Sequence, residues 1–375
     1  MVVNNWFFLI LAVFLCVLVM TGVIIPQILL IAFRKKLFDE TDSRKIHKGH
    51  VPRLGGIAFF PSILFSVLLG VGVSSIAEDI PTLQLFSEHM RTFCFITCGL
   101  VILYLTGMAD DLIGVRYRAK FIFQLFAALL MIAGGIWLDN LHGLFYINML
   151  PLGMAIALTL AVSIFIINAI NLIDGIDGLA SGLSGVAAAF YGIAFFMTGH
   201  YFYSLIAFAT LGALISFFFY NVAGSPDKHR KIFMGDTGTL TIGFILSVFG
   251  CRICMFESME YDINPGVVAF APLLIPGFDV IRVYFRRVRR HRNPFLPDKT
   301  HIHHKLLALG LKQKIVMPLI ILASVCLTLL SLWLAGFMNI TFILLIDMAL
   351  WILGNMFLTS LIRKRELRLQ TKLYD

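Results

Sequence analysis

Polar residues that could do chemistry are concentrated in one short stretch between two long apolar runs. The stretch reads Asn168-Ala-Ile-Asn171-Leu-Ile-Asp174-Gly-Ile-Asp177-Gly-Leu179. Carboxylates at the depth or edge of a bilayer are unfavourable unless they are paired, wetted or bound to a metal. An Asp-Gly pair alone also forms ordinary turns, but two such pairs beside two Asn favour a binding or catalytic site. Because 172–178 contains no Lys or Arg, we expect a metal ion or a cation from another loop to balance these carboxylates.

A second acidic motif closes an earlier apolar run. Asp110 and Asp111 are adjacent, and their mutual repulsion tends to raise one pKa unless a cation intervenes. They could form a Mg²⁺ or general-base site. The alternative is a solvated helix end that leads into a turn at Gly114.

A third motif, Phe233-Met-Gly-Asp-Thr-Gly238, precedes another apolar run. Glycine on both sides of Asp236 lets the backbone approach a ligand closely. Thr237 and Thr239 could instead cap the following helix, whose N-terminus favours an anion. The motif is compatible with a metal-binding Asp236 and with a simple helix start.

Basic residues and histidines gather in two other connections. The connection 286–314 combines an Arg run with three His, and 44–56 combines basic residues with a Gly pair. Such clusters also occur as positive loops on anionic headgroups. Three His could bind zinc, donate to phosphate oxygens or stabilise a leaving group; with several Asp nearby, Mg²⁺-assisted phosphate binding is favoured. The candidates are His47, Lys48, Arg290, Arg292, His301, His303 and His304.

The composition indicates a membrane protein. Of the 375 residues, 59% are hydrophobic and 14% charged, against about 25% charged in soluble domains. A span needs about 20 apolar residues, and the runs are too long and continuous for a β-barrel. We therefore predict an all-α polytopic protein with about eleven transmembrane helices, at 6–33, 55–77, 92–109, 119–138, 149–171, 179–198, 201–222, 238–256, 265–285, 315–336 and 339–361.

The distribution of charge predicts the orientation. Alternate connections and the C-terminal segment hold 27 of the 30 Lys and Arg. By the positive-inside rule these are cytoplasmic, which puts the N-terminus outside and the C-terminus inside. The net charge of +9 then reflects topology, and no nucleic acid is expected as a partner. We predict one transmembrane domain, 1–375, with catalytic cytoplasmic loops at 34–54, 110–120, 172–178, 223–237 and 286–314.

Carboxylates, cations and histidines on one membrane face suit Mg²⁺-assisted phosphoryl transfer between a soluble anionic substrate and a lipid. One alternative is a transporter of an anionic solute, although few ionisable residues lie within the predicted spans. Another is a zinc hydrolase that uses the His cluster, although the chain lacks His-Glu-x-x-His.

The chain resembles the polyprenyl-phosphate N-acetylhexosamine-1-phosphate transferases, which include the MraY-like enzymes. Within that family it is most similar to the WecA and TagO type. Residues 39–45 depart from that branch's usual pattern, which leaves the sugar open. Five motifs in the family's order carry the resemblance: His-Lys-Gly-x-x-Pro-x-x-Gly-Gly (47–56), Asp-Asp (110–111), Asn-x-x-Asn-x-x-Asp-Gly-x-Asp-Gly-Leu (168–179), Phe-Met-Gly-Asp-Thr-Gly (233–238) and His-Ile-His-His (301–304).

The resemblance implies a Mg²⁺-dependent transfer (EC 2.7.8.-) of N-acetylhexosamine-1-phosphate, most often GlcNAc-1-phosphate, from a UDP-sugar to undecaprenyl phosphate. The products are undecaprenyl-diphospho-sugar and UMP, in the first membrane step of a cell-envelope polysaccharide such as lipopolysaccharide O-antigen. Mn²⁺ is expected to substitute for Mg²⁺. We expect a multi-pass protein of the bacterial inner membrane with its site facing the cytoplasm, and a homodimer is considered.

The resemblance also implies roles for individual residues. The expected catalytic residues are Asp110, Asp111, Asp174, Asp177, His301, His303 and His304. The expected substrate-binding residues are His47, Lys48, Asn168, Asn171, Arg290 and Arg292. Asp111 and Asp236 are the expected metal ligands. A covalent aspartyl intermediate and direct attack by the lipid phosphate are both open, and direct attack is favoured.

Overall fold

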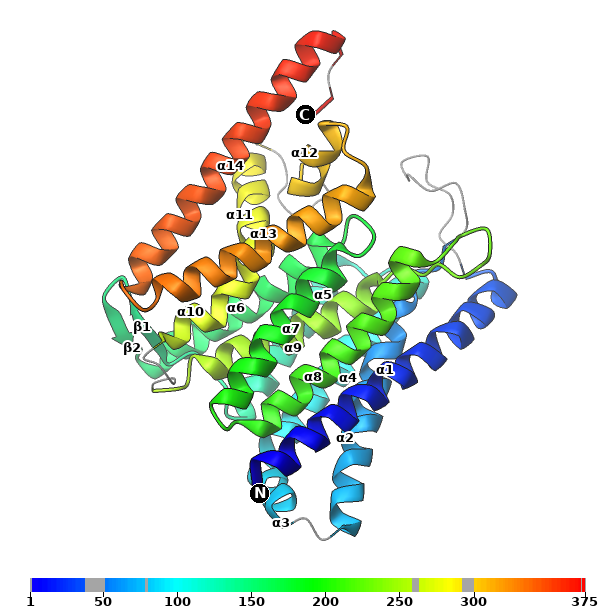
Figure 1. Cartoon of the computed structure of the whole chain (residues 1–375), viewed down its shortest axis with the longest axis vertical. Helices are drawn as coiled ribbons and strands as arrows, with labels where there is room; N and C mark the ends of the chain where they lie inside the picture. The colour runs from blue at the N-terminus through cyan, green and yellow to red at the C-terminus, as the bar shows by residue number, and fades with distance from the viewer. Residues whose placement is uncertain are drawn as a thin grey trace.

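Long helices build almost the whole structure, a computed structural model that describes residues 2–37, 51–77, 80–257, 263–291, 300–371 and 373–374 (Figure 1). The longer helices are α1 (Val2–Lys35), α2 (Phe59–Ile76), α4 (Met90–Ile113), α5 (Tyr117–Ala133), α6 (Leu152–Ile173), α7 (Leu179–Met197), α8 (Tyr201–Phe218), α9 (Gly235–Ile253), α11 (Leu274–Arg289), α13 (Gln313–Leu334) and α14 (Ile340–Leu369). Shorter elements are η1 (Gly55–Ala58), α3 (Ile80–Glu88), β1 (Asn140–Leu144), β2 (Ile147–Met149), η2 (Phe219–Ala223), α10 (Pro265–Phe270), η4 (Ala271–Leu273) and α12 (Ile302–Ala308).

The helices confirm an all-α polytopic membrane protein. Among the described residues, nine helical segments are long and apolar enough to cross a membrane. The other two predicted spans form α5, which has 17 residues, and α9, which opens with the polar sequence Gly-Asp-Thr-Gly-Thr. The prediction of eleven spans is therefore matched by helices throughout, but length and apolar character support nine of them.

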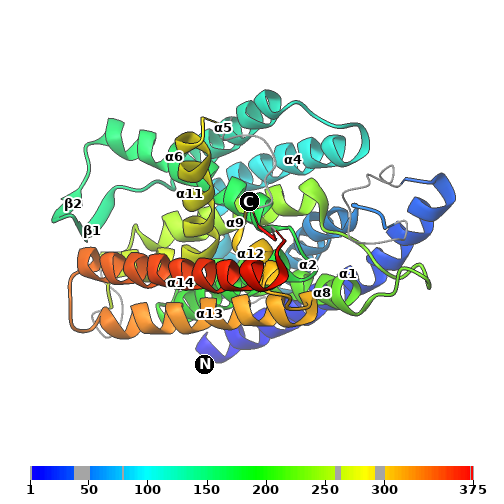
Figure 2. The same ribbon diagram turned by 90° about the horizontal axis from the view of Figure 1, so that it is seen from above.

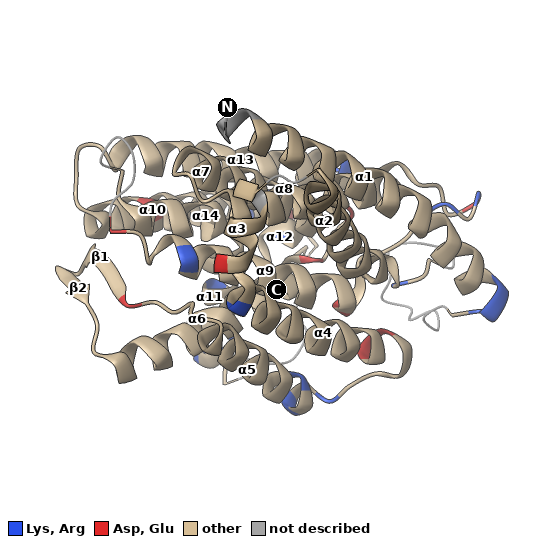
Figure 3. Ribbon diagram, turned by 90° about the horizontal axis from the view of Figure 1, so that it is seen from below, with Lys and Arg blue, Asp and Glu red and all other residues tan. Residues whose placement is uncertain are grey.

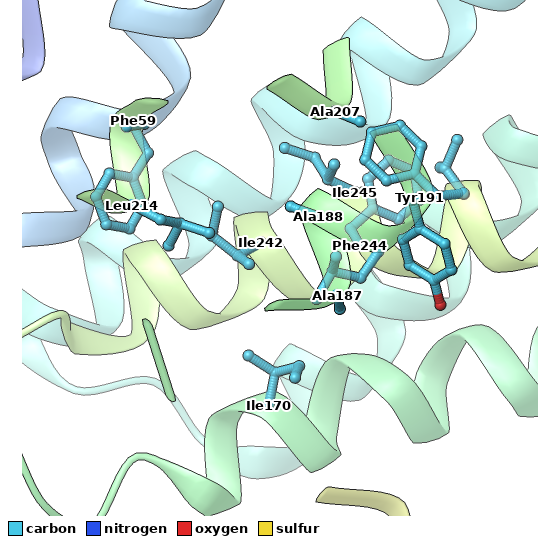
Figure 4. Close-up of a cluster of buried hydrophobic side chains, with 14 of the residues drawn as sticks. Phe59, Ile170, Ala187, Ala188, Tyr191, Ala207, Leu214, Ile242, Phe244 and Ile245 are labelled. Atoms are coloured by element: carbon cyan, nitrogen blue, oxygen red, sulfur yellow. The ribbon is translucent and has the colours of Figure 1, made fainter. Parts of the chain in front are cut away.

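Helix α9 can be this polar because protein, not lipid, surrounds it. It is buried along most of its length and packs chiefly against α4 and α6. Figure 4 shows Ile242, Phe244 and Ile245 of α9 within a cluster that includes Ile170 of α6 and Tyr191 of α7. Small residues let helices in membranes approach closely. At Gly243, for example, a Cβ would lie 2.7 Å from the Cα of Ile167.

One predicted span is interrupted. The apolar run at 265–285 was expected to form a single helix, but it divides into α10, the short turn η4 and α11. Pro272 lies in η4, and proline removes a backbone donor and clashes with the preceding helical turn. The interruption is therefore encoded by a residue inside an otherwise uniform apolar run.

The connections gather at two ends of the bundle. At one end, the β1–β2 hairpin is tied to its neighbours: His142 Nε2 donates to Cys254 O at 2.8 Å, and Phe145 N donates to Thr341 Oγ1 at 2.7 Å. The turns 114–116 and 174–178, the connection 224–234 and α12 meet at the other end (Figures 1 and 2). Long stretches of helix between the ends carry no charge (Figure 3). Which end faces the cytosol stays a prediction of the charge pattern.

Three glycines let the chain close tightly around the start of α9. A Cβ on Gly56 would lie 2.0 Å from Gly238 N, and one on Gly107 would lie 2.4 Å from Thr237 Cα. Gly55 N and Gly56 N donate to Phe233 O and Met234 O, each at 2.9 Å. The Gly pair at 55–56, which belongs to the basic connection 44–56, therefore serves backbone packing.

We expect Gly56→Ala to destabilise the protein by about 3 kcal/mol, because the added methyl group meets backbone that cannot rotate away. Thermal unfolding in detergent should show a midpoint several degrees lower. Gly72→Ala in α2 is the matched control, since a Cβ there meets nothing within 4 Å. Equal midpoints for the two variants would contradict this account of the packing.

Candidate active site

Asp111 caps the N-terminus of α9 from a neighbouring helix. Its Oδ1 accepts from Asp236 N at 2.7 Å, and its Oδ2 accepts from Thr237 N at 2.9 Å and Thr237 Oγ1 at 2.6 Å. Gly235 makes this approach feasible with a positive φ of 71° and no side chain. The first amides of a helix need such acceptors, and a carboxylate also suits the positive end of the helix dipole.

The sequence had suggested that Thr237 and Thr239 cap this helix with their own side chains. The structure corrects that expectation, because Thr237 Oγ1 donates to Asp111 and Thr239 Oγ1 donates back to Gly235 O at 3.2 Å. A hydroxyl one turn inside a helix can reach the preceding carbonyls more easily than the free amides at the start.

Lys120 joins the other two carboxylates at this point. Its Nζ lies 2.6 Å from Asp110 Oδ2 and 2.5 Å from Asp236 Oδ2. Asp110 Oδ1 accepts from Val115 N at 2.6 Å, which also explains its place before the turn at Gly114. The three charged side chains remain 16–25% exposed, so the cluster is accessible to a ligand.

Asn168 and Asn171 lie on α6, one turn apart along the same face. Asn168 Nδ2 donates to Gln124 Oε1 at 2.8 Å, and Asn171 Nδ2 donates to Thr239 Oγ1 at 2.7 Å. The second bond places Asn171 beside the first turn of α9. The structure thus brings Asn171 near Asp236, while Asn168 faces α5.

Asp174 and Asp177, the two carboxylates of the stretch 168–179, have different surroundings. Asp177 Oδ2 lies 2.5 Å from Nζ of Lys231, which comes from the connection before α9. This ion pair confirms that a cation from another loop balances the motif. Asp174 keeps contact with solvent, yet desolvation by the surrounding protein, and then the charge of Asp236, raise its pKa to about 7. The charge of Arg53 opposes that rise.

The histidines of the His-Ile-His-His motif (301–304) form one group beside the Asp-Gly turn. His301 Nδ1 donates to Asp279 Oδ2 at 2.8 Å, and Asp279 Oδ1 accepts from Ile302 N at 3.0 Å. Asp279, fully buried in α11, therefore anchors the start of α12. His303 packs directly against Gly175, where an added Cβ would lie 2.2 Å from its Nε2.

His303 is buried, and neither of its ring nitrogens has a hydrogen-bond partner among the described residues. Burial, followed by the neighbouring His304, lowers the pKa of His303 to about 3. The ring is therefore neutral near pH 7. Its centroid lies 5.8 Å from that of His301 and 4.2 Å from that of His304.

Of the remaining predicted residues, the structure describes only Arg290. Arg290 is exposed at the C-cap of α11. His47, Lys48 and Arg292 lie outside the described residues.

Sequence reasoning missed three residues that organise the site: Lys120, Lys231 and Asp279. Lys120 and Lys231 were counted only as topology signals, although each lies in a connection rich in candidate residues. Asp279 had a clearer signal, since a carboxylate inside an apolar run favours a functional or paired residue.

The carboxylates beside the start of α9 are ligands of the kind that Mg²⁺ prefers. Within the described ranges, no three His, Cys, Asp or Glu side chains are grouped as a metal site. Structural and catalytic zinc require three or four protein ligands. Mg²⁺ binds through one or two carboxylates together with water and substrate phosphate. Asp236 and Asp174, whose like charges interact, provide carboxylates of that kind beside the start of α9.

Comparison with known proteins shows the family of the chain. Residues 93–253 match the model of glycosyl transferase family 4. A probable undecaprenyl-phosphate N-acetylglucosaminyl 1-phosphate transferase of Bacillus subtilis (strain 168) is 31% identical over 334 residues, which cover 87% of this chain and 86% of that protein. An undecaprenyl-phosphate alpha-N-acetylglucosaminyl 1-phosphate transferase of Yersinia pestis is 30% identical over 303 residues, 80% of this chain and 78% of that one.

The protein with that name from Escherichia coli (strain K12) is 29% identical over 296 residues, 78% of this chain and 75% of that one. The matched segment 93–253 contains four of the site's elements: the Asp110–Asp111 pair, Lys120, the Asn-Asp-Gly stretch and the start of α9. The chain therefore belongs to glycosyl transferase family 4, and it is similar over most of its length to undecaprenyl-phosphate N-acetylglucosaminyl 1-phosphate transferases.

Proposed function

We propose that this protein transfers GlcNAc-1-phosphate from UDP-GlcNAc to undecaprenyl phosphate and releases UMP. The main support is the convergence of Asp110, Asp111, Asp236 and Lys120 at the start of α9, where a diphosphate and a metal could be held together. The relatives' names supply the lipid acceptor and the sugar. The transporter alternative receives no support from these relatives.

In the proposed reaction, an oxygen of the lipid phosphate attacks the phosphorus that carries the sugar. The bond from that phosphorus to the bridging oxygen of the diphosphate breaks, and UMP leaves with that oxygen. A phosphate monoester is already partly ionised at neutral pH. Direct attack therefore needs only modest help from a base, which we assign to Asp110, and no aspartyl intermediate is required.

We assign metal binding to Asp236 and Asp111, with Asp174 nearby. Bound Mg²⁺ would neutralise the charge that develops on the diphosphate. Asp111 has a second task, because both of its oxygens already accept hydrogen bonds from the start of α9. Asp111 should therefore hold the start of α9 in place even when no metal is bound.

The other groups bind and orient the substrates. Lys120 lies between Asp110 and Asp236 and can move its charge towards the diphosphate once Mg²⁺ is bound. Asn171 and Asp177 form the wall that faces the nucleotide, and the neutral His303 can donate one hydrogen bond to phosphate or sugar. We place this end of the bundle on the cytoplasmic side of the inner membrane, where UDP-sugars are available.

We expect Asp236→Asn to lower the rate of UMP release about 10²- to 10³-fold, the usual loss when one preorganised electrostatic contact is removed. UMP should be measured with UDP-GlcNAc, undecaprenyl phosphate and Mg²⁺, with EDTA as the zero-metal baseline. Asp227→Asn is the matched control, because Asp227 is an exposed acid in the connection 224–234 that precedes α9. Release that survives EDTA, or that is equal in both variants, would refute the proposed metal site.

The sugar is tested by offering membranes a panel of UDP-N-acetylhexosamines and identifying the lipid product by mass spectrometry. We expect undecaprenyl-diphospho-GlcNAc to exceed the GalNAc product at least tenfold. A site that hydrogen-bonds one sugar hydroxyl discriminates against an epimer that leaves its polar groups unpaired. A dominant product with another sugar would overturn the donor assignment and leave the reaction class intact.

A further inference from the structure

A pocket of about 760 Å³ lies between α11, α12 and α14, outside the cluster of carboxylates. Phe278 and Ile281 of α11 and Trp351 and Ile352 of α14 form much of its apolar wall. Ile281 and Ile352 are 42% and 48% exposed, so the wall continues onto the outer, apolar surface of the bundle. Figures 1 and 2 show α11 and α12 beside the C-terminal half of α14.

The polar end of this pocket is cationic. Arg282, Lys305 and Arg363 contribute to its lining, and no carboxylate does. Arg282 is balanced by Asp279 at 2.8 Å. Among the described residues, Lys305 and Arg363 have no carboxylate partner. A buried charge without a counter-charge is unfavourable, and Lys305 is only 5% exposed.

Lys305 is held in place by polar contacts to α14. Its Nζ donates to Asn355 Oδ1 at 3.0 Å and to Thr359 Oγ1 at 3.1 Å. Desolvation, then the charge of Arg282, lower its pKa to about 8. It therefore still carries a positive charge near pH 7, and this charge adds to that of the exposed Arg363 at the same end of the pocket.

We propose that this pocket binds an anionic phospholipid of the surrounding bilayer, with its phosphate near Arg363 and Lys305 and its acyl chains along Phe278, Ile281 and Ile352. Charge complementarity and the apolar wall together select a lipid. Basic pockets between transmembrane helices are suited to anionic headgroups. Bound lipid would link α14 to α12, the helix that carries His303.

The pocket is separate from the proposed transfer site. On α12, His303 packs against Gly175, whereas Lys305 turns to Asn355 of α14. The helix therefore lies between the carboxylate cluster and the pocket, so a phosphate beside Lys305 is not positioned to attack a substrate there. The proposal does not depend on the transferase reaction.

The test is native mass spectrometry of the delipidated full-length protein with dioleoyl-phosphatidylglycerol or with the zwitterionic dioleoyl-phosphatidylcholine. We expect the anionic lipid to bind at least fivefold more tightly. Arg363→Gln should weaken it about fivefold, which corresponds to about 1 kcal/mol for one basic residue near a headgroup. Lys364→Gln is the control, because Lys364 is the exposed neighbour that does not line the pocket.

A second pair of variants tests the apolar wall without changing charge. Ile352→Trp should fill the pocket and reduce phosphatidylglycerol binding, whereas Leu353→Trp, outside the lining, should leave it within about twofold of wild type. Equal affinity for the two lipids, or equal effects within either pair, would overturn the proposal. If inorganic phosphate displaces the bound phosphatidylglycerol, the pocket is a simple anion site and the proposal is overturned. If undecaprenyl phosphate binds there more tightly than phosphatidylglycerol and displaces it, the pocket belongs to the acceptor lipid, and the proposal is overturned as well.

Discussion

The site depends on how the backbone amides at the N-terminus of α9 find hydrogen-bond acceptors. A helix that starts inside a membrane bundle exposes amides that need acceptors, and Asp111 of α4 supplies them. The same bonds fix Asp236 in the first turn of α9, and the adjacent Asp110 then lies close enough for Lys120 to join both carboxylates. One capping interaction therefore aligns two helices and the charged groups that they carry.

Charge balance explains why the site needs several connections. Lys120 and Lys231 each come from a different segment than the carboxylates they neutralise, and Asp174 is left under the influence of neighbouring negative charge. A diphosphate and a divalent metal would add charges of opposite sign to this cluster. The neutral, buried His303 closes one side against the Asp-Gly turn.

Motif content and apolar runs predicted the membrane class, the family and the residues that surround the start of α9. They could not predict which cation meets which carboxylate, because Lys120 and Asp236 are joined only through tertiary packing. The Asp-Asp motif made Asp111 a candidate site residue. Its capping role could not be predicted, because the sequence does not show that α4 ends beside α9. The break at Pro272 has a signal in the local sequence, the proline itself, which the span count did not use. The polar start of α9 is tolerated because protein surrounds this helix, and burial by protein is not visible in local sequence.

The central claim is that the start of α9 forms a divalent-metal site completed by substrate phosphate. Electron paramagnetic resonance of Mn²⁺ with the purified protein tests it directly, with and without UDP-GlcNAc. We expect the protein to bind Mn²⁺ and its affinity for Mn²⁺ to increase when UDP-GlcNAc is added. In Asp236→Asn, we expect UDP-GlcNAc no longer to increase that affinity. Mn²⁺ binding that is indifferent both to the nucleotide sugar and to the loss of the Asp236 charge would contradict the account.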